Sequence, residues 1–294
     1  MFVFKTAVVG AGTMGGEIAQ TLAAADLPVV LKDVEQRFVD QGLEKARQVT
    51  DGQLQGLVKK EKISADQAKA QLEHTVGLIT GTTEYEGFGD VDFVVEAVPE
   101  RIDIKKQVFA DLDAATPGHA ILASNTSSLS ITEMGRATSR PDKVVGFHYF
   151  YPASVMRLIE VIEGEETSEE TMQSAAGFAQ QIRKMPIRCR EVPGFVVNRI
   201  LNSAASEIWR HKDETGASAQ EIDKEIADAK VTPMGPFYLS DLLGLDTVLH
   251  VAEHLQKSYG ERFYVSPEMR ELVAAGNFGQ KTGKGFYDHG KNGS

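Results

Sequence analysis

A histidine and a glutamate twelve positions apart, His148 and Glu160, have the residue types of a general base and its partner. Apolar residues at 143–149 and 156–162 predict two strands, and a turn centred near Ser154 would place His148 directly opposite Glu160. Directly opposed residues have Cβ atoms about 4.5–5.5 Å apart. A carboxylate at that distance fixes the imidazole tautomer, which suits removal of an alcohol proton while hydride leaves for a nicotinamide. The alternative is a polar pair at a sheet end with no catalytic role.

A glycine-rich turn near the N-terminus has the pattern G-x-G-x-x-G. Its residues are Gly10, Ala11, Gly12, Thr13, Met14 and Gly15. In a dinucleotide-binding turn the first glycine permits the bend, the second lets a pyrophosphate approach the backbone, and the third lets the helix pack on the strand. The N–H groups at the start of that helix then face the negative charge. A strand before the turn and a helix after it favour this interpretation over a glycine turn without a ligand.

An acidic residue, Asp33, follows Gly15 by 18 positions and lies at the end of the next predicted strand. Its carboxylate would accept hydrogen bonds from the ribose hydroxyls of adenosine and would repel a 2′-phosphate. The sequence therefore predicts NAD as the cofactor in preference to NADP. FAD, which uses a similar fingerprint, is a minor alternative.

Hydroxyl and amide side chains follow another predicted strand, at residues 124–128. In an open α/β sheet, ligands bind beyond the carboxyl ends of the strands, so this segment could hold a substrate oxygen, although a helix cap or a turn explains it equally well. Asn198, on a predicted helix, could face the same cleft. The six histidines other than His148 lack a comparable carboxylate partner. Two of them, His250 and His254, are four positions apart, but no third ligand accompanies them, and the sequence predicts no metal site.

The first half of the chain supplies a scaffold for these residues by alternating short apolar runs with helix-like stretches. The apolar runs lie at residues 2–9, 28–31, 91–95, 120–123 and 144–147, and the first helix is predicted over 13–25. Strands that alternate with helices indicate βαβ units and a parallel sheet covered on both faces. We therefore expect an α/β fold with a Rossmann-type doubly wound sheet.

Residues 35–75 interrupt this alternation because they are rich in Lys, Glu, Gln and Ala. They predict two helices that form an inserted antiparallel arm, with Ser64 and Gln67 as a capping box at the second helix. A solvated helical pair is one interpretation of the arm, and an arm that contacts a ligand is the other.

The chain changes character near residue 190, where Glu191-Val192-Pro193-Gly194 forms a break. Beyond the break, helices are predicted at 195–210, 218–229, 239–257 and 267–275. We therefore expect two domains. Residues 1–190 would bind the cofactor, and residues 191–294 would form an all-α domain.

Composition excludes several classes of function. The 294-residue chain has 31 Lys and Arg against 42 Asp and Glu, and its net charge of −11 is unsuited to a broad nucleic-acid or anionic-membrane surface. No apolar run approaches the roughly 20 residues that span a bilayer. The single cysteine, Cys189, cannot form an internal disulfide, and the N-terminus lacks the features of a signal peptide. We therefore expect a cytoplasmic protein with no nucleic-acid or membrane partner.

Together these residues resemble the 3-hydroxyacyl-CoA dehydrogenase family over nearly the whole chain. The matching blocks, in the family's order, are residues 9–15, 96–100, 123–129, 193–199, 233–237 and 281–287. Six blocks in one order argue against a chance match or a different Rossmann dehydrogenase. The resemblance implies NAD-linked oxidation of an (S)-3-hydroxyacyl-CoA to the 3-ketoacyl-CoA, or the reverse.

The resemblance also assigns expected roles to residues. Those that match the family's catalytic base, its partner and the positions around the reacting oxygen are His148, Glu160, Ser127 and Asn198. Those that match positions near the cofactor are Glu100, Lys105 and Lys281. The helical arm matches the part that helps to hold coenzyme A, with Lys59, Lys60 and Lys62 as candidate phosphate contacts. The helical C-terminal domain matches the family's interface for a homodimer.

One block departs from the family's pattern. The family usually has His-Phe-Phe-Asn-Pro where this chain has His148-Tyr149-Phe150-Tyr151-Pro152. The phenol of Tyr151 is longer and bulkier than an amide and has one O–H donor, so it could narrow the acyl pocket. The alternative substrate is a CoA-free 3-hydroxy acid, such as a sugar acid or carnitine, for which arm lysines would have no use. A nucleotide-binding protein without catalysis is a third interpretation, and the presence of both His148 and Glu160 argues against it.

Overall fold

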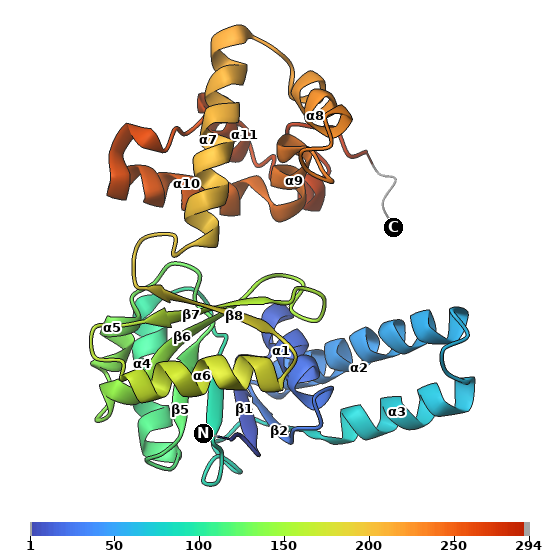
Figure 1. Cartoon of the computed structure of the whole chain (residues 1–294), viewed down its shortest axis with the longest axis vertical. Coiled ribbons are helices and arrows are strands. Elements are labelled where there is room, and N and C mark those ends of the chain that lie inside the picture. The colour runs from blue at the N-terminus through green and yellow to red at the C-terminus, as the bar shows by residue number, and fades with distance from the viewer. Residues whose placement is uncertain (1, 291–294) are drawn as a thin grey trace. The chain divides into compact units, whose positions relative to one another are not determined.

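The computed structural model describes residues 2–290 of the chain. The chain divides between Glu191 and Val192 into two compact units. Each unit has its own apolar core. The first unit contains a sheet with flanking helices, and the second unit is helical (Figure 1).

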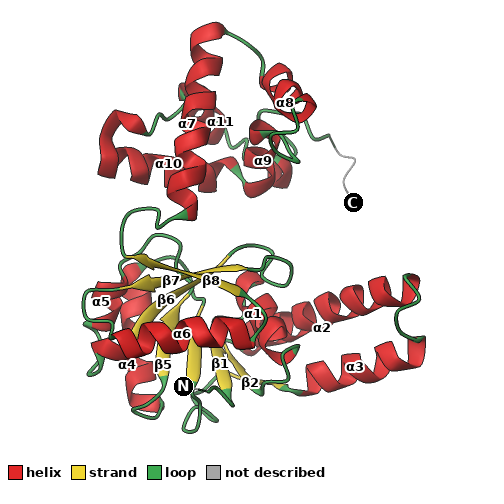
Figure 2. Cartoon of the chain, viewed as in Figure 1, coloured by secondary structure: helices red, strands yellow, loops and turns green. Residues whose placement is uncertain are grey.

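An eight-stranded sheet forms the centre of the first unit (Figure 2). Its strands are β1 (Thr6–Val9), β2 (Val29–Lys32), β3 (Ile79–Thr82), β4 (Phe93–Glu96), β5 (Ile121–Ser124), β6 (Val144–Tyr149), β7 (Leu158–Glu163) and β8 (Met185–Arg190). Their order across the sheet is β3-β2-β1-β4-β5-β6-β7-β8, and each neighbouring pair is parallel except β6–β7. The strand order reverses between β1 and β4, so the predicted doubly wound sheet is confirmed.

The central strands correspond to the continuous apolar runs of the sequence. All four residues are buried in each of β1, β2, β4 and β5, because parallel strands are covered on both faces. The edge strands β3 and β8 have exposed positions and lack such a run, so the apolar pattern does not predict them.

Helices cover both faces of the sheet. The α-helices that flank the sheet, apart from the helical arm described below, are α1 (Thr13–Ala23), α4 (Ile102–Ala115), α5 (Ile131–Gly135) and α6 (Glu169–Gln181). One core includes Ile18 of α1 and Phe178 of α6, which pack with Phe93 and Phe147 of the sheet. Helices α4 and α5 lie on the opposite face (Figure 1). This arrangement holds the carboxyl ends of β1, β4, β5 and β6 at one edge of the sheet.

A helical arm formed by α2 (Gln36–Lys59) and α3 (Ala65–Gly77) projects from the first unit (Figure 1). The predicted capping box is present: Ser64 Oγ accepts from the N–H of Gln67 at 3.2 Å, and Gln67 Oε1 accepts from the N–H of Ser64 at 2.8 Å. Arg47 of α2 and Glu73 of α3 form an ion pair at 3.1 Å. These contacts confirm the inserted helical pair.

The second unit consists of packed helices and short turns. Its helices are α7 (Val197–Thr215), α8 (Ala219–Asp228), α9 (Pro236–Leu243), α10 (Leu245–Tyr259) and α11 (Pro267–Ala274). The prediction of one helix over 239–257 is wrong, because Gly244, with a φ of +94°, separates α9 from α10. Glycine adopts this φ without a steric penalty, so one residue can end a helix inside a continuous apolar pattern. Within residues 2–290, no helix combines the length and apolar character needed to cross a bilayer.

Candidate active site

His148 and Glu160 face each other across the antiparallel pair β6–β7, as the sequence predicts. His148 Nδ1 lies 2.8 Å from Glu160 Oε2. The histidine is 7% exposed and the glutamate is fully buried. Because the carboxylate holds Nδ1, the orientation of the imidazole ring is fixed by the register of the two strands.

The predicted dinucleotide turn joins β1 to α1. Gly10 has a φ of +98°, and a Cβ there would lie 2.6 Å from Ala97 O, while a Cβ on Gly15 would lie 1.7 Å from Gly10 O. The protein's own packing therefore requires both glycines. A Cβ on Gly12 would meet no protein atom within 4 Å. The space beside Gly12 is open to a ligand, and a pyrophosphate group fits that position.

Helix α1 begins at the same turn. Its N-cap residue, Gly12, supplies no side-chain cap, and Thr13 and Met14 follow it in the first turn of the helix. Gly12 and Thr13 are exposed, and Met14 is half-buried. The first N–H groups of the helix therefore point toward accessible space, where they can bind a phosphate oxygen.

Asp33 directly follows β2 and contacts the glycine turn. Its Oδ2 accepts a hydrogen bond from the N–H of Ala11 at 2.6 Å, and its Oδ1 accepts one from the N–H of Val34 at 2.7 Å. The carboxylate is thus held beside the turn. This is the place that the ribose-binding acidic residue takes in the dinucleotide fingerprint.

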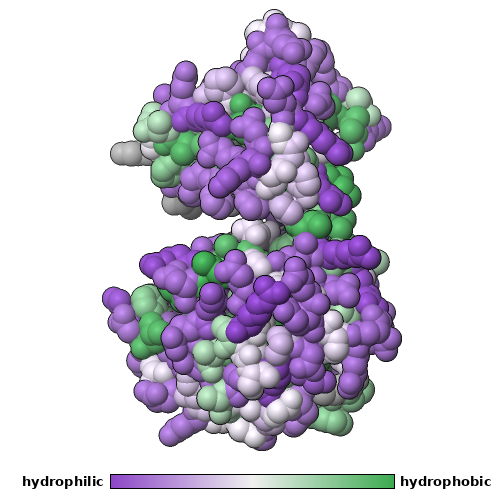
Figure 3. Space-filling view, turned by 90° about the vertical axis from the view of Figure 1, so that its left-hand side faces the viewer, coloured by the Kyte–Doolittle hydropathy of each residue, from purple (hydrophilic) through white to green (hydrophobic). Residues whose placement is uncertain are grey.

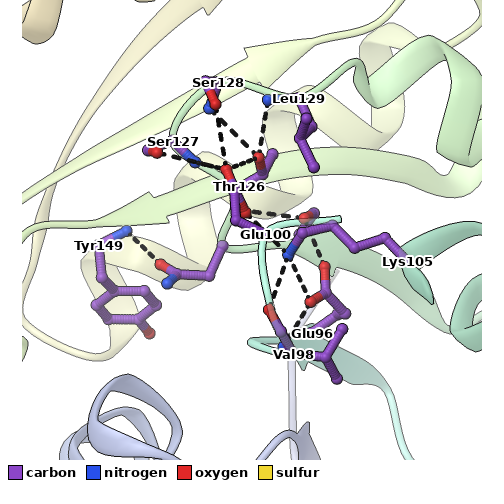
Figure 4. A network of polar contacts seen from close by, with 11 residues as sticks. Glu96, Val98, Glu100, Lys105, Thr126, Ser127, Ser128, Leu129 and Tyr149 are labelled. Carbon is purple, nitrogen blue, oxygen red and sulfur yellow. Dashed lines mark hydrogen bonds and ion pairs between the residues drawn. The ribbon is translucent and has the colours of Figure 1, made fainter. Parts of the chain in front are cut away.

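A polar cluster lies where β4 and β5 end, and Figure 4 shows its hydrogen bonds. Glu100 Oε1 accepts from Thr126 Oγ1 at 2.6 Å and from the N–H of Ser127 at 3.0 Å. Glu100 Oε2 lies 3.2 Å from Lys105 Nζ. Burial by itself would raise the pKa of Glu100, but Lys105 and the bonds from Thr126 and Ser127 outweigh it and lower the pKa from its ordinary 4.5. Glu100 is therefore a carboxylate that holds Ser127 in place.

Lys105 supports this arrangement from the interior, since only 1% of its side chain is exposed. Its ammonium lies 2.7 Å from Glu96 Oε1 and 3.2 Å from Val98 O (Figure 4). Together with Glu100 Oε2, these two oxygen atoms provide one acceptor for each of the three N–H donors of the ammonium. Lys105 is thus placed behind Glu100, in contact with it.

Glu96 is a residue of this cluster that the sequence reasoning did not single out. It ends β4, is fully buried, and accepts from Ser124 Oγ of β5 at 2.6 Å through Oε2. A buried carboxylate needs a cationic partner, which Lys105 provides. The sequence feature that could have indicated Glu96 is an acidic residue at the end of an apolar run, followed by a lysine nine positions later.

Asn125 links this cluster to the strand that carries His148. Its Oδ1 accepts a hydrogen bond from the N–H of Tyr149 at 2.8 Å, and Tyr149 directly follows His148 (Figure 4). One connected set of polar contacts thus links the ends of β4, β5 and β6.

Two of the predicted site residues, Asn198 and Lys281, belong to the second unit. Asn198 lies in the first turn of α7 with a partly exposed side chain. Lys281 Nζ lies 2.5 Å from Asp246 Oδ1. The other predicted residues, namely His148, Glu160, Ser127, Glu100, Lys105, Asp33 and the glycine turn, all lie in the first unit.

The expectation that no other histidine has a carboxylate partner is wrong. His289 Nε2 lies 2.8 Å from Oδ2 of the fully buried Asp241 in the second unit. The exposed His74 and His119 also contact aspartates, at 3.0 and 3.2 Å. These partners are distant in sequence, so spacing does not reveal them. In the described part of the chain, no group of three or more His, Cys, Asp or Glu is arranged to hold a metal ion.

Both units match one family of known proteins. Residues 5–192 match the NAD binding domain of 3-hydroxyacyl-CoA dehydrogenase, and residues 194–289 match its C-terminal domain. The chain belongs to the 3-hydroxyacyl-CoA dehydrogenase family. It is therefore an NAD-dependent oxidoreductase, as the sequence predicts.

Relatives within the 3-hydroxyacyl-CoA dehydrogenase family match this chain over nearly its full length. The 3-hydroxybutyryl-CoA dehydrogenase of Clostridioides difficile is 41% identical over 98% of this chain and 100% of the relative. The mitochondrial hydroxyacyl-coenzyme A dehydrogenase of Sus scrofa is 36% identical over 98% of this chain and 92% of the relative. The crystal structure of (S)-3-hydroxybutyryl-CoA dehydrogenase from Ralstonia eutropha has a TM-score of 0.90 at 38% identity, covering 99% of this chain and 100% of that one.

Proposed function

We propose that this protein interconverts an (S)-3-hydroxyacyl-CoA and the corresponding 3-ketoacyl-CoA with NAD as the hydride carrier. The observation that carries the proposal is the buried His148–Glu160 pair at the edge of the sheet where the open glycine turn also lies. Support comes from two relatives that match nearly the whole chain, one named as a 3-hydroxybutyryl-CoA dehydrogenase and one as a probable 3-hydroxybutyryl-CoA dehydrogenase.

His148 is the proposed general base. It would remove the proton from the 3-hydroxyl group in the oxidation and return it in the reduction. Glu160 would orient the ring through Nδ1 and balance the positive charge on the protonated imidazole. Ser127, held by Glu100, and Asn198 would bind around the reacting oxygen.

NAD, when bound, supplies the hydride acceptor for this chemistry. Residues of the glycine turn would bind the pyrophosphate, because the space beside Gly12 is open and the first turn of α1 is uncapped. Asp33 would bind the adenosine ribose and disfavour a 2′-phosphate. Glu100, Lys105 and Lys281 would complete the cofactor surroundings, Lys105 through its contact with Glu100.

The α2–α3 arm is proposed to hold the coenzyme A part of the substrate. Lys59, at the end of α2, and Lys60 and Lys62, in the turn that follows, would contact its phosphates. Binding of these phosphates does not require a basic protein overall, since a few lysines and helix N–H groups can neutralise a bound nucleotide. The second unit is proposed to form a homodimer interface.

The test is a spectrophotometric NADH assay with 3-ketoacyl-CoAs of different chain lengths and with acetoacetate as the CoA-free control. We expect turnover of acetoacetyl-CoA with a marked preference for NADH over NADPH. His148→Gln should lower kcat by about 10²–10⁴-fold, because general-base catalysis is lost. NADH binding, measured by fluorescence titration, should stay nearly unchanged.

Three results would contradict the proposal. Faster reduction of acetoacetate than of acetoacetyl-CoA would favour a CoA-free 3-hydroxy acid as substrate. Equal use of NADH and NADPH would contradict the proposed role of Asp33 in selecting against a 2′-phosphate. A fully active His148→Gln variant would remove the role of His148.

A further inference from the structure

The loop that joins β6 to β7, residues 150–157, is held by a buried lysine outside the site described above. Lys184 directly precedes β8 and is 8% exposed. Its ammonium donates to Ala153 O at 2.6 Å and to Met156 O at 2.8 Å. Hydrogen bonds from a charged donor are roughly twice as strong as neutral ones. One buried cation therefore fixes two carbonyl groups of the loop.

A buried carboxylate on α1 contacts the same loop. The side chain of Glu17 is 3% exposed, and its Oε1 lies 3.1 Å from Lys45 Nζ on the arm helix α2. Its Oε2 accepts from the N–H of Ser154 at 3.3 Å and from Ser154 Oγ at 3.4 Å. A buried carboxylate is costly unless it is paired and hydrogen-bonded, and here Lys45 and Ser154 meet both needs.

The arm helix also contacts the loop directly. Gln53 of α2 donates from Nε2 to Ser154 O at 3.4 Å, and its Oε1 accepts from Gln20 Nε2 of α1 at 3.2 Å. The N–H, the carbonyl and the hydroxyl of Ser154 are thus all bonded to α1 or α2. The middle of the loop therefore lies against α1 and α2.

The loop connects the two strands that carry the acid–base pair. It follows His148 and precedes Glu160, and it includes Tyr151. The ring centroid of Phe150 lies 4.6 Å from that of His148. A displaced loop would therefore change the surroundings of His148, while the β6–β7 pairing would keep His148 opposite Glu160.

We propose that Glu17 and Lys184 are positioning residues for the loop 150–157. Glu17 fixes the loop against α1 and, through Lys45, against the arm helix α2, whereas Lys184 fixes it to the segment that precedes β8. The arm and the surroundings of His148 then form one rigid assembly. This inference rests on the proposed function, in which the arm holds the coenzyme A part of the substrate. Contacts to that remote part would raise kcat as well as lower KM, because their binding energy serves to align the reacting group.

The test compares acetoacetyl-CoA with acetoacetyl-pantetheine, which has the same reacting group but lacks the nucleotide. The quantity measured is the ratio of the two kcat values in reduction by NADH, with each KM determined separately. For the wild-type protein we expect a ratio of about tenfold or more. In Glu17→Gln, Lys184→Met and Gln53→Ala we expect the ratio to fall toward one, through loss of kcat with acetoacetyl-CoA.

Matched variants separate positioning from general damage to the fold. Lys143→Met breaks the ion pair with Glu170, away from both the loop and the arm, and should keep the wild-type ratio. Lys184→Arg retains a positive charge and donors, so it should preserve more of the ratio than Lys184→Met. Gln53→Ala changes an exposed side chain, so the proposal stays testable if the buried variants fold poorly.

The outcomes distinguish this inference from the proposed function. A wild-type ratio near one, or equal losses of kcat with both substrates in Gln53→Ala, would overturn the positioning role alone. A folded wild-type protein that reduces neither substrate would overturn the proposed function and the positioning role together.

Discussion

Tyr151 stands where the family usually has an asparagine beside the acid–base pair. Its side chain is 56% exposed and lies in the β6–β7 loop, three positions after His148. A phenol occupies more volume than a carboxamide and cannot offer the same donors and acceptors. We therefore expect Tyr151 to limit the length of the acyl chain that fits beside His148.

Replacement of Tyr151 by asparagine tests this at the residue scale. In Tyr151→Asn, kcat/KM for a ten-carbon 3-ketoacyl-CoA should rise about tenfold relative to the four-carbon substrate, because space is restored in the acyl pocket. The measurement is a chain-length series in the NADH assay. An unchanged chain-length profile would show that Tyr151 does not set specificity.

At the scale of elements, carboxylates join the ends of neighbouring strands. Glu96 connects β4 to β5 through Ser124, and Glu100 holds the turn after β5 through Thr126 and Ser127. The pKa of Glu100 is lowered because Lys105 and these hydrogen bonds outweigh the effect of burial. The ionised carboxylate is therefore bound more favourably in the folded state than in the unfolded chain.

The sign of this shift predicts an effect of acid on stability. The contribution of Glu100 is fully present above its ordinary pKa of 4.5 and is lost as the pH falls through the lowered pKa of the folded state. The free energy of unfolding should therefore decrease more steeply with acidification in the wild type than in Glu100→Gln. Urea unfolding at a series of pH values from about 6 to about 3 measures both slopes.

A control variant for this prediction is Glu44→Gln, which changes an exposed carboxylate of α2. It should have the same slope as the wild type. Parallel curves for the wild type and Glu100→Gln would contradict the stabilising role of the Glu100 carboxylate.

At the scale of the whole molecule, the second unit has large apolar side chains on its surface. Figure 3 shows apolar areas between polar ones on this unit. The exposed residues include the adjacent pairs Ile200–Leu201 on α7 and Leu242–Leu243 on α9. Large apolar side chains exposed to solvent occur at protein–protein interfaces. We infer that a second copy of the chain covers this surface.

Sedimentation analysis tests the predicted dimer. The wild type should sediment as a dimer, and Leu201→Glu or Leu243→Glu should shift it toward monomer, because a charge in an apolar interface costs several kcal/mol. Phe4→Glu, at an exposed apolar position of the first unit, should leave the dimer intact. A monomeric wild type would contradict the prediction.

The sequence alone determined the features that depend on local pattern. Buried parallel strands appear as continuous apolar runs, so β1, β2, β4 and β5 and the doubly wound sheet follow from them. The His148–Glu160 pairing follows because the register of a short hairpin is fixed by the position of its turn. The glycine turn follows because close backbone approaches allow no other residue at Gly10 and Gly15.

Contacts between side chains that are distant in sequence depend on how the elements pack. The periodicity of the chain does not specify which segments lie next to each other in space. It therefore does not predict the contacts of Glu96 with Lys105 and Ser124, or those of Lys184 with the loop carbonyls. The edge strands β3 and β8 have no continuous apolar run because residues in each of them are exposed to solvent. The end of α9 at Gly244 depends on one backbone angle rather than on an apolar pattern. Local pattern thus defined the fold and the acid–base pair, whereas buried polar contacts formed only where packing brought their partners together.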